Sequence, residues 1–354
     1  MNAISESAES RTGVSAPLKI LIVRLGAMGD VIHAIPAVMA LRHAFANAEM
    51  TWAIESRWVH LLEMYDLVDR IHRLDTREWR KGLWRSREAV LRSIRELRQQ
   101  KYDISIDFQA AIKSSVIAAL SGAPRRYGFS EAWEKPASLL YTYSVPAFRS
   151  HVVERSLELA SAVARREGSI LPDDLPHIMQ RATYKGKELT VARRRFAILN
   201  PGAGWGAKQW PAERYAEVAR ALGEDGIPSF INHGPDERDL ASKVARLSGG
   251  FALPLVATFS ESIAYVHSAA LFIGGDTGPM HLAALLQVPV VAIFGPTDPA
   301  RTGPYGTRSV VLRDPASVTS HKRNRAPEAG LLNITTEQVL QAARELLAVE
   351  GARE

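Results

Sequence analysis

A carboxylate, a hydroxyl and a glycine stand together in one turn of the second half of the chain. Asp276, Thr277 and Gly278 follow an apolar run typical of a buried strand, and they open a short amphipathic helix. Free N–H groups at a helix N-terminus bind phosphate, and the Asp276 carboxylate would be held away from that phosphate, free to take the hydroxyls of a sugar. The structural alternative is that Asp276 only caps the helix. These residues alone favour neither interpretation.

Two other turns of the second half carry residues of matching chemistry. Lys208 follows a glycine-rich loop at 202–206, which offers backbone N–H groups and one cation, as a diphosphate requires. Glu237 lies beside Gly234 and could bind the diol of a ribose. His281 follows the Asp276 turn by five residues. All three turns follow strands, so we expect them to converge at the carboxyl edge of one sheet and to form a nucleotide-sugar site.

Asp30 is the candidate in the first half of the chain. It stands in a turn with two glycines after the strand expected at 19–25, so it should face the second half across a cleft. A carboxylate opposite a nucleotide-sugar site can act as general base on an acceptor hydroxyl. It can also be a helix cap, and the same two alternatives hold for His33, three residues later. The turn sequence GAMGD is not a dinucleotide-binding glycine motif, and the chain has no Walker motif.

Strands and helices alternate in both halves, which predicts an α/β protein of two facing, doubly wound, Rossmann-like domains. We expect a disordered tail at 1–17, a first domain at 18–180 that binds the acceptor, and a second at 181–330 that binds the nucleotide sugar. A final helix within 331–354 should pack across the junction. The segment 125–146 is rich in turn residues and is expected to be irregular.

The net charge of +6 is concentrated in one segment. Residues 70–101 contain 11 Lys and Arg against 4 Asp and Glu, so this segment holds +7 and the rest of the chain −1. Trp79 and Trp84 alternate there with basic residues, among them Arg80, Lys81 and Arg85. The pattern suits lipid headgroups or nucleic acid, and it equally suits a solvated helix face with packed tryptophans.

Length and composition exclude several classes of protein. A chain of 354 residues can bury two full cores, and it has no run of 18 apolar residues that would cross a bilayer. The N-terminus lacks the apolar core of a signal peptide, so we expect a cytoplasmic protein. The absence of cysteine excludes disulfides, zinc–thiolate sites and thiol nucleophiles.

Five segments resemble one known family, the glycosyltransferase family 9 heptosyltransferases of bacterial lipopolysaccharide synthesis. They are RLGAMGDVIHAIPAVMALR, ISIDFQAAIKS, HVVERSLEL, NPGAGWGAKQWP and GGDTGPMHLAALLQVPVVAIFGPTDPARTGPYG. The resemblance extends over residues 18–347. ISIDFQAAIKS, the ASLLY run and HVVERSLEL are most similar to the heptosyltransferase I branch, whereas the glycine-rich loop after Gly202 is more like heptosyltransferase II.

The resemblance implies a GT-B fold and an inverting transfer of L-glycero-D-manno-heptose from ADP-heptose to Kdo of the inner-core lipid, Kdo-lipid A. It implies no metal and no cofactor, since ADP-heptose is itself a substrate. Asp30 would be the general base and Lys208 the diphosphate ligand, with Asp276, Thr277, Gly278 and His281 around the donor. Glu237 would also bind the donor, although Asp236 could be the matching residue.

We expect Arg80, Lys81 and Arg85 to meet a phosphorylated acceptor held at the cytoplasmic face of the inner membrane. The remaining alternatives are heptosyltransferase II or another family 9 enzyme with a different nucleotide sugar or acceptor, a nucleic-acid-binding protein, and an NAD-dependent oxidoreductase. Of these, nucleic-acid binding leaves the carboxylate-bearing turns unexplained.

Overall fold

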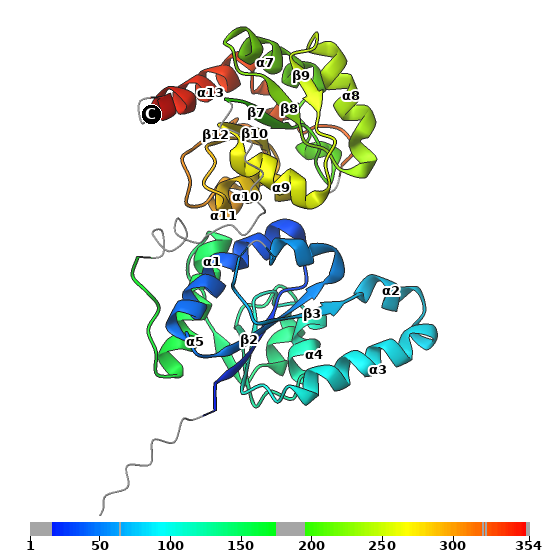
Figure 1. The fold of residues 1–354 in the computed structure, drawn as a ribbon, viewed down its shortest axis with the longest axis vertical. Helices are drawn as coiled ribbons and strands as arrows, with labels where there is room; N and C mark the ends of the chain where they lie inside the picture. The colour runs from blue at the N-terminus through cyan, green and yellow to red at the C-terminus, as the bar shows by residue number, and fades with distance from the viewer. Residues whose placement is uncertain (1–15, 64, 175–194, 321, 323, 352–354) are drawn as a thin grey trace, which may run out of the picture.

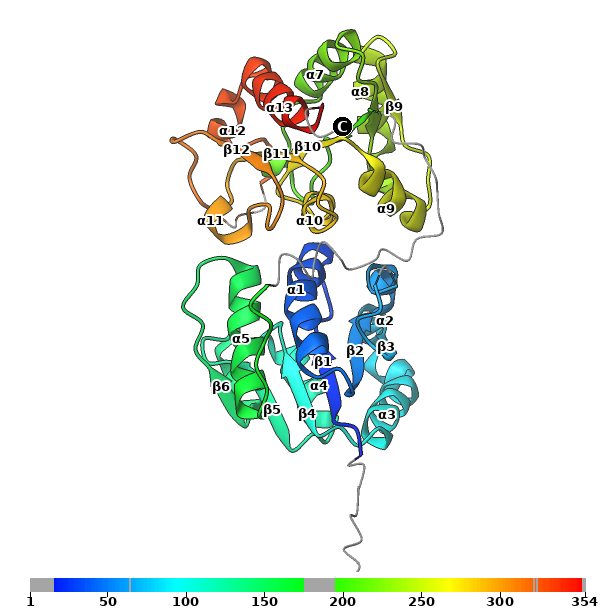
Figure 2. The same cartoon turned by 60° about the vertical axis from the view of Figure 1, so that its left-hand side comes forward.

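The structure is a computed structural model that describes residues 16–63, 65–174, 195–320, 322 and 324–351. Most of the expected tail (1–17) and the expected domain boundary at 180/181 lie outside these residues. The described chain forms two α/β units, which Figures 1 and 2 show one above the other.

The first unit is built on a six-stranded parallel sheet. Its strands are β1 Lys19–Val23, β2 Glu49–Glu55, β3 Arg70–Leu74, β4 Ile104–Asp107, β5 Arg125–Phe129 and β6 Tyr143–Val145. Their order in the sheet is β3-β2-β1-β4-β5-β6. The strand order reverses its direction between β1 and β4, where open sheets of this kind bind their ligands.

Helices cover both faces of this sheet. They are α1 Met28–Ala44, η1 Ser56–Leu61, α2 Thr76–Lys81, α3 Leu83–Gln99, α4 Ile112–Leu120, η2 Lys135–Leu140 and α5 Val152–Arg166. Ile20 and Ile22 of β1 pack in the core that contains α1 and α5, whereas Leu21 and Val23 pack in the core that contains residues of α3 and α4. Side chains alternate between the faces of a strand, so the unbroken apolar run of β1 is buried on both sides.

The prediction of irregular chain at 125–146 was wrong, because β5 and β6 lie there. β5 begins with two arginines and contains Gly128, so its sequence lacks an apolar strand pattern. Arg126 bonds the carbonyl oxygens of Leu140 and Ala123 through its side chain, and Tyr141 packs closely on Gly128. The contacts with Leu140 and Tyr141 come from a later part of the chain and stabilise the strand.

The second unit contains another parallel sheet of six strands. They are β7 Ala197–Asn200, β8 Ser229–Ile231, β9 Ala252–Pro254, β10 Leu271–Gly275, β11 Val290–Phe294 and β12 Ser309–Arg313, in the order β12-β11-β10-β7-β8-β9. If the six strands are numbered 1 to 6 along this half of the chain, their order in the sheet, read from β9, is 3-2-1-4-5-6. This is the order of the first sheet, and its reversal lies between β7 and β10.

The helices of the second unit again cover both faces of its sheet. They are η3 Gly206–Lys208, α7 Ala212–Glu224, η4 Pro235–Glu237, α8 Arg238–Leu247, α9 Phe259–Ser268, α10 Gly278–Leu285, α11 Pro299–Thr302, α12 Ala329–Asn333 and α13 Thr336–Gly351. Leu199 and Ile273 pack on the face covered by α7 and α13. Phe272 and Val290 pack on the opposite face, with Ile263 of α9 and Leu282 of α10.

The C-terminal helix does not lie where the sequence analysis expected it. Residues Val339, Ala343, Leu346 and Leu347 of α13 are buried in the core of the second unit, and the helix packs against α7 and the strands β10 to β12. Its apolar stripe has helical spacing and fits the sheet beneath it. The described part of α13 therefore covers the second sheet and is not packed across the junction.

The two units meet through α1 and α10. Val31 and Ile35 of α1 belong to the same continuous apolar cluster as Leu282 and Leu285 of α10. Each of these helices begins directly after a central strand, α1 after β1 and α10 after β10. The carboxyl edges of both sheets therefore face the junction.

Candidate active site

Asp30 lies in the first turn of α1, at the junction. One carboxylate oxygen is 2.9 Å from a guanidinium nitrogen of Arg24, and the other accepts the backbone N–H of Ala27 at 3.0 Å. Asp30 is the third helical residue and not the N-cap, which is Ala27. Its carboxylate nevertheless satisfies a free N–H at the helix start, so the structural role is real. The side chain is 49% exposed, which leaves it accessible to a substrate hydroxyl.

Lys208, Asp276 and His281 form one connected cluster in the second unit. The Lys208 ammonium is 2.6 Å from one carboxylate oxygen of Asp276, and His281 Nε2 is 3.1 Å from the other. All three side chains are largely buried. Burial alone would raise the pKa of the Asp276 carboxyl, but the His281 hydrogen bond and the charges of His281 and Lys208 hold the pKa well below its usual range. Asp276 is therefore an anion at neutral pH.

The structure corrects the expectation for Asp276. The N-cap of α10 is Thr277, and the Asp276 side chain bonds Lys208 and His281 instead of the helix start. Both carboxylate oxygens already have partners, so the carboxylate is not held free for sugar hydroxyls as we expected. Its charge holds Lys208 beside the N-terminus of α10, where the N–H groups of Gly278 and its neighbours begin the helix.

Asn200 connects three turns, and sequence reasoning did not single it out. The residue ends β7 at the reversal of strand order and is 3% exposed. Its amide donates to the carbonyl of Gly202 at 2.9 Å and to the Thr277 hydroxyl at 3.4 Å, while its oxygen accepts from Asn232 at 2.6 Å. Its position at a strand end was the available signal.

Glu237 joins the glycine-rich loop to the turn after β8. Its carboxylate accepts the N–H of Gly234 at 2.8 Å, and it lies so close to Gly202 that a Cβ there would be 2.2 Å from an oxygen. A side chain at 202 would therefore have to displace the Glu237 carboxylate. The structure thus brings Glu237, the loop and the Asp276 cluster to one edge of the sheet, as the strand pattern predicted.

Two glycines form the contact between the units. A Cβ on Gly29 would be 2.8 Å from Cδ2 of His281, and one on Gly278 would be 2.7 Å from the sulfur of Met28. Because Asp30 directly follows Gly29, this contact brings the candidate base next to the Asp276 cluster. The candidate residues of the two halves therefore belong to one site.

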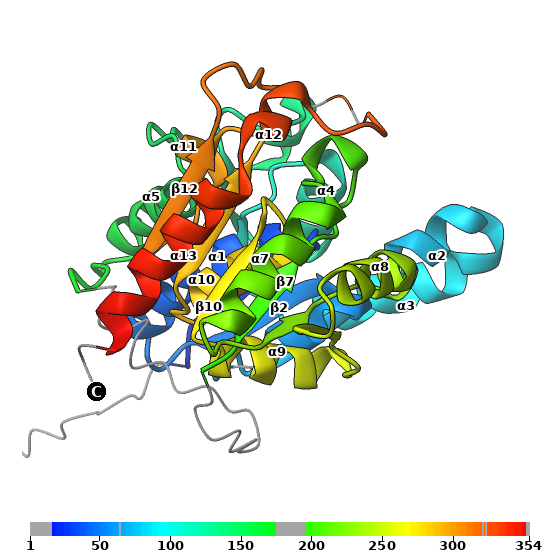
Figure 3. The ribbon, with the colours of Figure 1, turned by 90° about the horizontal axis from the view of Figure 1, so that it is seen from above.

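The predicted acceptor residues lie on α2 and α3, beyond β3. Figure 3 shows these helices extending away from the body of the molecule. The side chains of Arg80, Lys81 and Arg85 are outside the described part of the structure. The sequence left open whether Trp79 binds a ligand or packs against the protein. The structure shows it partly buried against the core that contains Leu74 and Leu97.

The described residues contain neither a membrane-spanning helix nor a cluster that could bind a metal ion. No helix in the described ranges is both long enough and apolar enough to cross a membrane. Among the same residues, no group of three or more His, Asp or Glu side chains has an arrangement that could hold a metal ion.

Known proteins share this arrangement. The model of glycosyltransferase family 9 (heptosyltransferase) matches residues 90–330. Lipopolysaccharide heptosyltransferase 1 of Escherichia coli O18:K1:H7 is 30% identical over 314 residues, 86% of this chain and 94% of that protein. The protein of the same name in E. coli K12 is 29% identical over 340 residues, 93% and 100% of the two chains. The solved structure of E. coli heptosyltransferase WaaC with ADP-2-deoxy-2-fluoro heptose covers 93% of this chain and 99% of that one, at 25% identity and a TM-score of 0.77.

Two facing, doubly wound sheets with this likeness define a glycosyltransferase of GT-B architecture, which confirms the predicted fold class. The chain belongs to glycosyltransferase family 9, the heptosyltransferases. The dehydrogenase and nucleic-acid-binding alternatives are thereby excluded as the main activity.

Proposed function

We propose that the enzyme transfers L-glycero-D-manno-heptose from ADP-heptose to Kdo of the lipopolysaccharide inner core, with Kdo-lipid A as acceptor. Two relatives with 29% and 30% identity are named lipopolysaccharide heptosyltransferase 1, and the similar WaaC structure holds an ADP-heptose analogue. The observation that carries the proposal is the contact between Gly29 and His281, because it sets Asp30 beside the cluster around Asp276.

In this proposal the second unit binds the donor. The diphosphate lies at the N-terminus of α10, where Thr277 and Gly278 offer N–H groups and the helix dipole favours negative charge. Lys208, held at that place by Asp276, adds a positive charge that grows in importance as the leaving diphosphate gains charge. Glu237 binds the ribose hydroxyls from the turn after β8. This charge stabilisation comes from the protein, and we propose that transfer uses no metal.

The first unit supplies the base. The acceptor hydroxyl oxygen forms a bond to the anomeric carbon from the face opposite the diphosphate, and the bond from that carbon to the diphosphate oxygen breaks. The hydroxyl proton passes to Asp30, and the electron pair of the broken bond leaves with ADP. Arg24, 2.9 Å from Asp30, orients the carboxylate. Attack from the opposite face inverts the anomeric centre.

We further propose that the basic segment 70–101 guides the enzyme to its acceptor at the cytoplasmic face of the inner membrane. Phosphorylated lipid carries negative charge, and each Lys or Arg near such a surface contributes about 1 kcal/mol of attraction. Arg80, Lys81 and Arg85 are the residues we expect to be closest to the acceptor.

One observation favours a second candidate within the family. The loop at 202–206 is glycine-rich, a pattern that resembles heptosyltransferase II, whose acceptor already carries one heptose. The two candidates use the same donor and differ in the acceptor.

The test is to incubate the purified full-length chain with ADP-heptose and to follow ADP release. We expect release with Kdo-lipid A and little release without a lipid acceptor. A parallel reaction contains Kdo-lipid A that already carries one heptose. Release with this second acceptor alone would replace our proposal with heptosyltransferase II activity, and release from another ADP-sugar but not from ADP-heptose would contradict the proposed donor.

A further inference from the structure

His33 is a buried histidine of the first unit at the junction. It lies on α1, one turn after Asp30, and is 6% exposed. Within the described part of the chain, neither ring nitrogen has a hydrogen-bond partner. Among these residues, the ring is therefore held in place by packing and not by hydrogen bonds.

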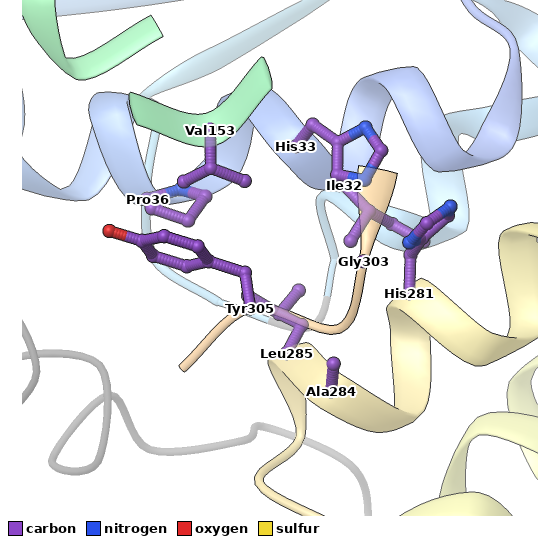
Figure 4. Close-up of a pocket in the computed structure, with 9 residues that line it drawn as sticks. All are labelled: Ile32, His33, Pro36, Val153, His281, Ala284, Leu285, Gly303 and Tyr305. Carbon is purple, nitrogen blue, oxygen red and sulfur yellow. The ribbon is translucent and has the colours of Figure 1, made fainter. Parts of the chain in front are cut away.

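The ring of His33 packs against the donor cluster of the other unit. Its centroid is 4.2 Å from that of His281, with the two planes at 65°, an edge-to-face arrangement. His281 in turn bonds Asp276, and Asp276 bonds Lys208. The side chains of His33 and His281 come from helices on opposite sides of the junction, as Figure 4 shows.

Charged and titratable groups face His33 from each element around it. Arg24 precedes α1, and His281 and Asp276 lie on the α10 side. His151 caps α5, and its ring centroid is 6.2 Å from that of His33. Glu154 of α5 and Tyr305 of the loop after α11 lie next to His151. Burial first, then the charges of His281, Arg24 and His151, hold the pKa of His33 well below its usual range, against a smaller opposing effect of Asp276. The imidazole is therefore neutral at physiological pH.

A small cavity lies beside this contact, between α1, α5, α10 and the loop that carries Gly303 and Tyr305. Its size is on the order of one water molecule. His33 and His281 both line this cavity.

We propose that His33 is a positioning residue of the donor site, supplied by the acceptor-binding unit. Its ring supports the ring of His281, which keeps the Asp276 carboxylate and, through it, Lys208 in place for the donor diphosphate. The donor site is then complete only when the two units are in contact. This inference rests on the proposed function, because it assigns Lys208 and Asp276 to donor binding.

The experiment compares His33→Ala, His33→Phe and a matched control, His43→Ala, which removes an exposed histidine from the same helix. Kinetic constants for the donor are measured at saturating acceptor. We expect His33→Ala to raise the donor KM or lower kcat by roughly ten- to a hundredfold, since displaced catalytic groups cost that much, with little change in the acceptor KM. His33→Phe restores a ring and should remain within about threefold of wild type, as should His43→Ala.

A spectroscopic readout makes the test independent of any sugar substrate. The imidazole nitrogens of His281 are followed by NMR in protein labelled with ¹⁵N-histidine, assigned with a His281→Gln variant. We expect His33→Ala to shift the His281 signals and His33→Phe and His43→Ala to leave them nearly unchanged. Thermal unfolding checks that each variant is folded.

Two outcomes would overturn the inference. If His33→Ala matches wild type in donor kinetics and in the His281 signals, His33 positions nothing. If folded His33→Phe is as impaired as His33→Ala, the ring nitrogens carry the role and packing does not. A wild-type enzyme that fails to use ADP-heptose would contradict the proposed function instead, and the NMR comparison would still decide about His33.

Discussion

The ligand edges of the two sheets share a strand order but differ in how their charged groups are held. At the second edge, Lys208, Asp276 and His281 are between 87% and 93% buried and are bonded to one another. At the first edge, Asp30 is half exposed and bonded to Arg24 and the chain beside it. A buried, paired cluster is rigid before its ligand arrives, whereas an exposed carboxylate can exchange partners. We infer that the donor side is built in advance and that the acceptor side adapts.

The largest expected effect follows from removing the exposed carboxylate of Asp30 at the first edge. Asp30→Asn keeps the size of the side chain but not its ability to take a proton. Loss of a general base typically lowers kcat by roughly 10²- to 10⁴-fold. Donor affinity, measured by calorimetry, should remain near wild type, with Glu49→Gln as a surface control. Turnover within a few-fold of wild type would leave Asp30 with a structural role alone.

At the opposite edge, Lys208→Met removes the cation from the buried cluster. We expect kcat to fall roughly 10²- to 10³-fold, as when other groups that stabilise a charged transition state are lost, and donor affinity to fall as well. Among the described residues, Asp276 then keeps only His281 as a partner, and breaking its buried pair with Lys208 should cost up to about 3–5 kcal/mol of stability. The control is Lys19→Met, which removes a half-exposed ion pair with Glu49. Unchanged donor affinity would exclude Lys208 from the donor site.

The proposed acceptor side is tested through the charges of the basic segment 70–101. Replacing Arg80, Lys81 and Arg85 with glutamine should raise the acceptor KM roughly fivefold per charge and flatten its dependence on salt, with donor binding unchanged. The matched control replaces three exposed basic residues of α8, Arg238, Lys243 and Arg246. An equal loss of donor binding in the first variant would assign the three residues a structural role.

The smallest expected effect is on the pH dependence of stability, and it comes from His33 at the junction. Burial and nearby charges lower the pKa of His33, so the unfolded chain takes up a proton more readily than the folded one. The contribution of His33 to the free energy of unfolding is therefore fully present above about pH 6.5. It is lost as the pH falls below that value, by at most about 1.4 kcal/mol per pH unit. Asp276 also stabilises the fold less as the pH falls, but this effect begins only below about pH 4.

His33→Phe should therefore lower the slope of Tm against pH between pH 6.5 and 5, relative to His43→Ala. His72 and His151, whose pKa values burial also lowers, contribute in the same range and remain in both variants. The difference in slope, and not the whole slope, is the quantity to measure. Parallel curves would contradict a neutral, buried His33.

The sequence was informative where local pattern decides the structure. Apolar runs revealed β1, β7, β10 and β11, because strands buried on both faces need apolar residues throughout. The turns after these strands contained Lys208, Asp276 and Asp30, and the structure brings them to one junction. The strand β12 was missed because it is only partly buried, and its sequence SVVLR follows turn residues without a clear pattern.

What could not be predicted depends on contacts between distant segments. The role of Asn200 rests on Gly202, Asn232 and Thr277, which lie in three different turns. A helix cap was one of the two roles open to Asp276, and its contacts with Lys208 from another loop and with His281 explain why its carboxylate points elsewhere. The contact of His33 with His281 depends on how the two halves meet, which no local pattern encodes.

The two glycines at the junction allow the two halves of the molecule to approach each other closely. Gly29 and Gly278 have no side chains, so the spacing between the halves is set there by main chain against a histidine ring and a methionine. The glycines contribute only backbone to these contacts, so an added side chain would have to displace His281 or Met28 or push the two halves apart. At Gly29 the side chain in the way is the buried His281, so a methyl group added there would either disturb the Asp276 cluster or increase the distance between that cluster and the proposed base, Asp30.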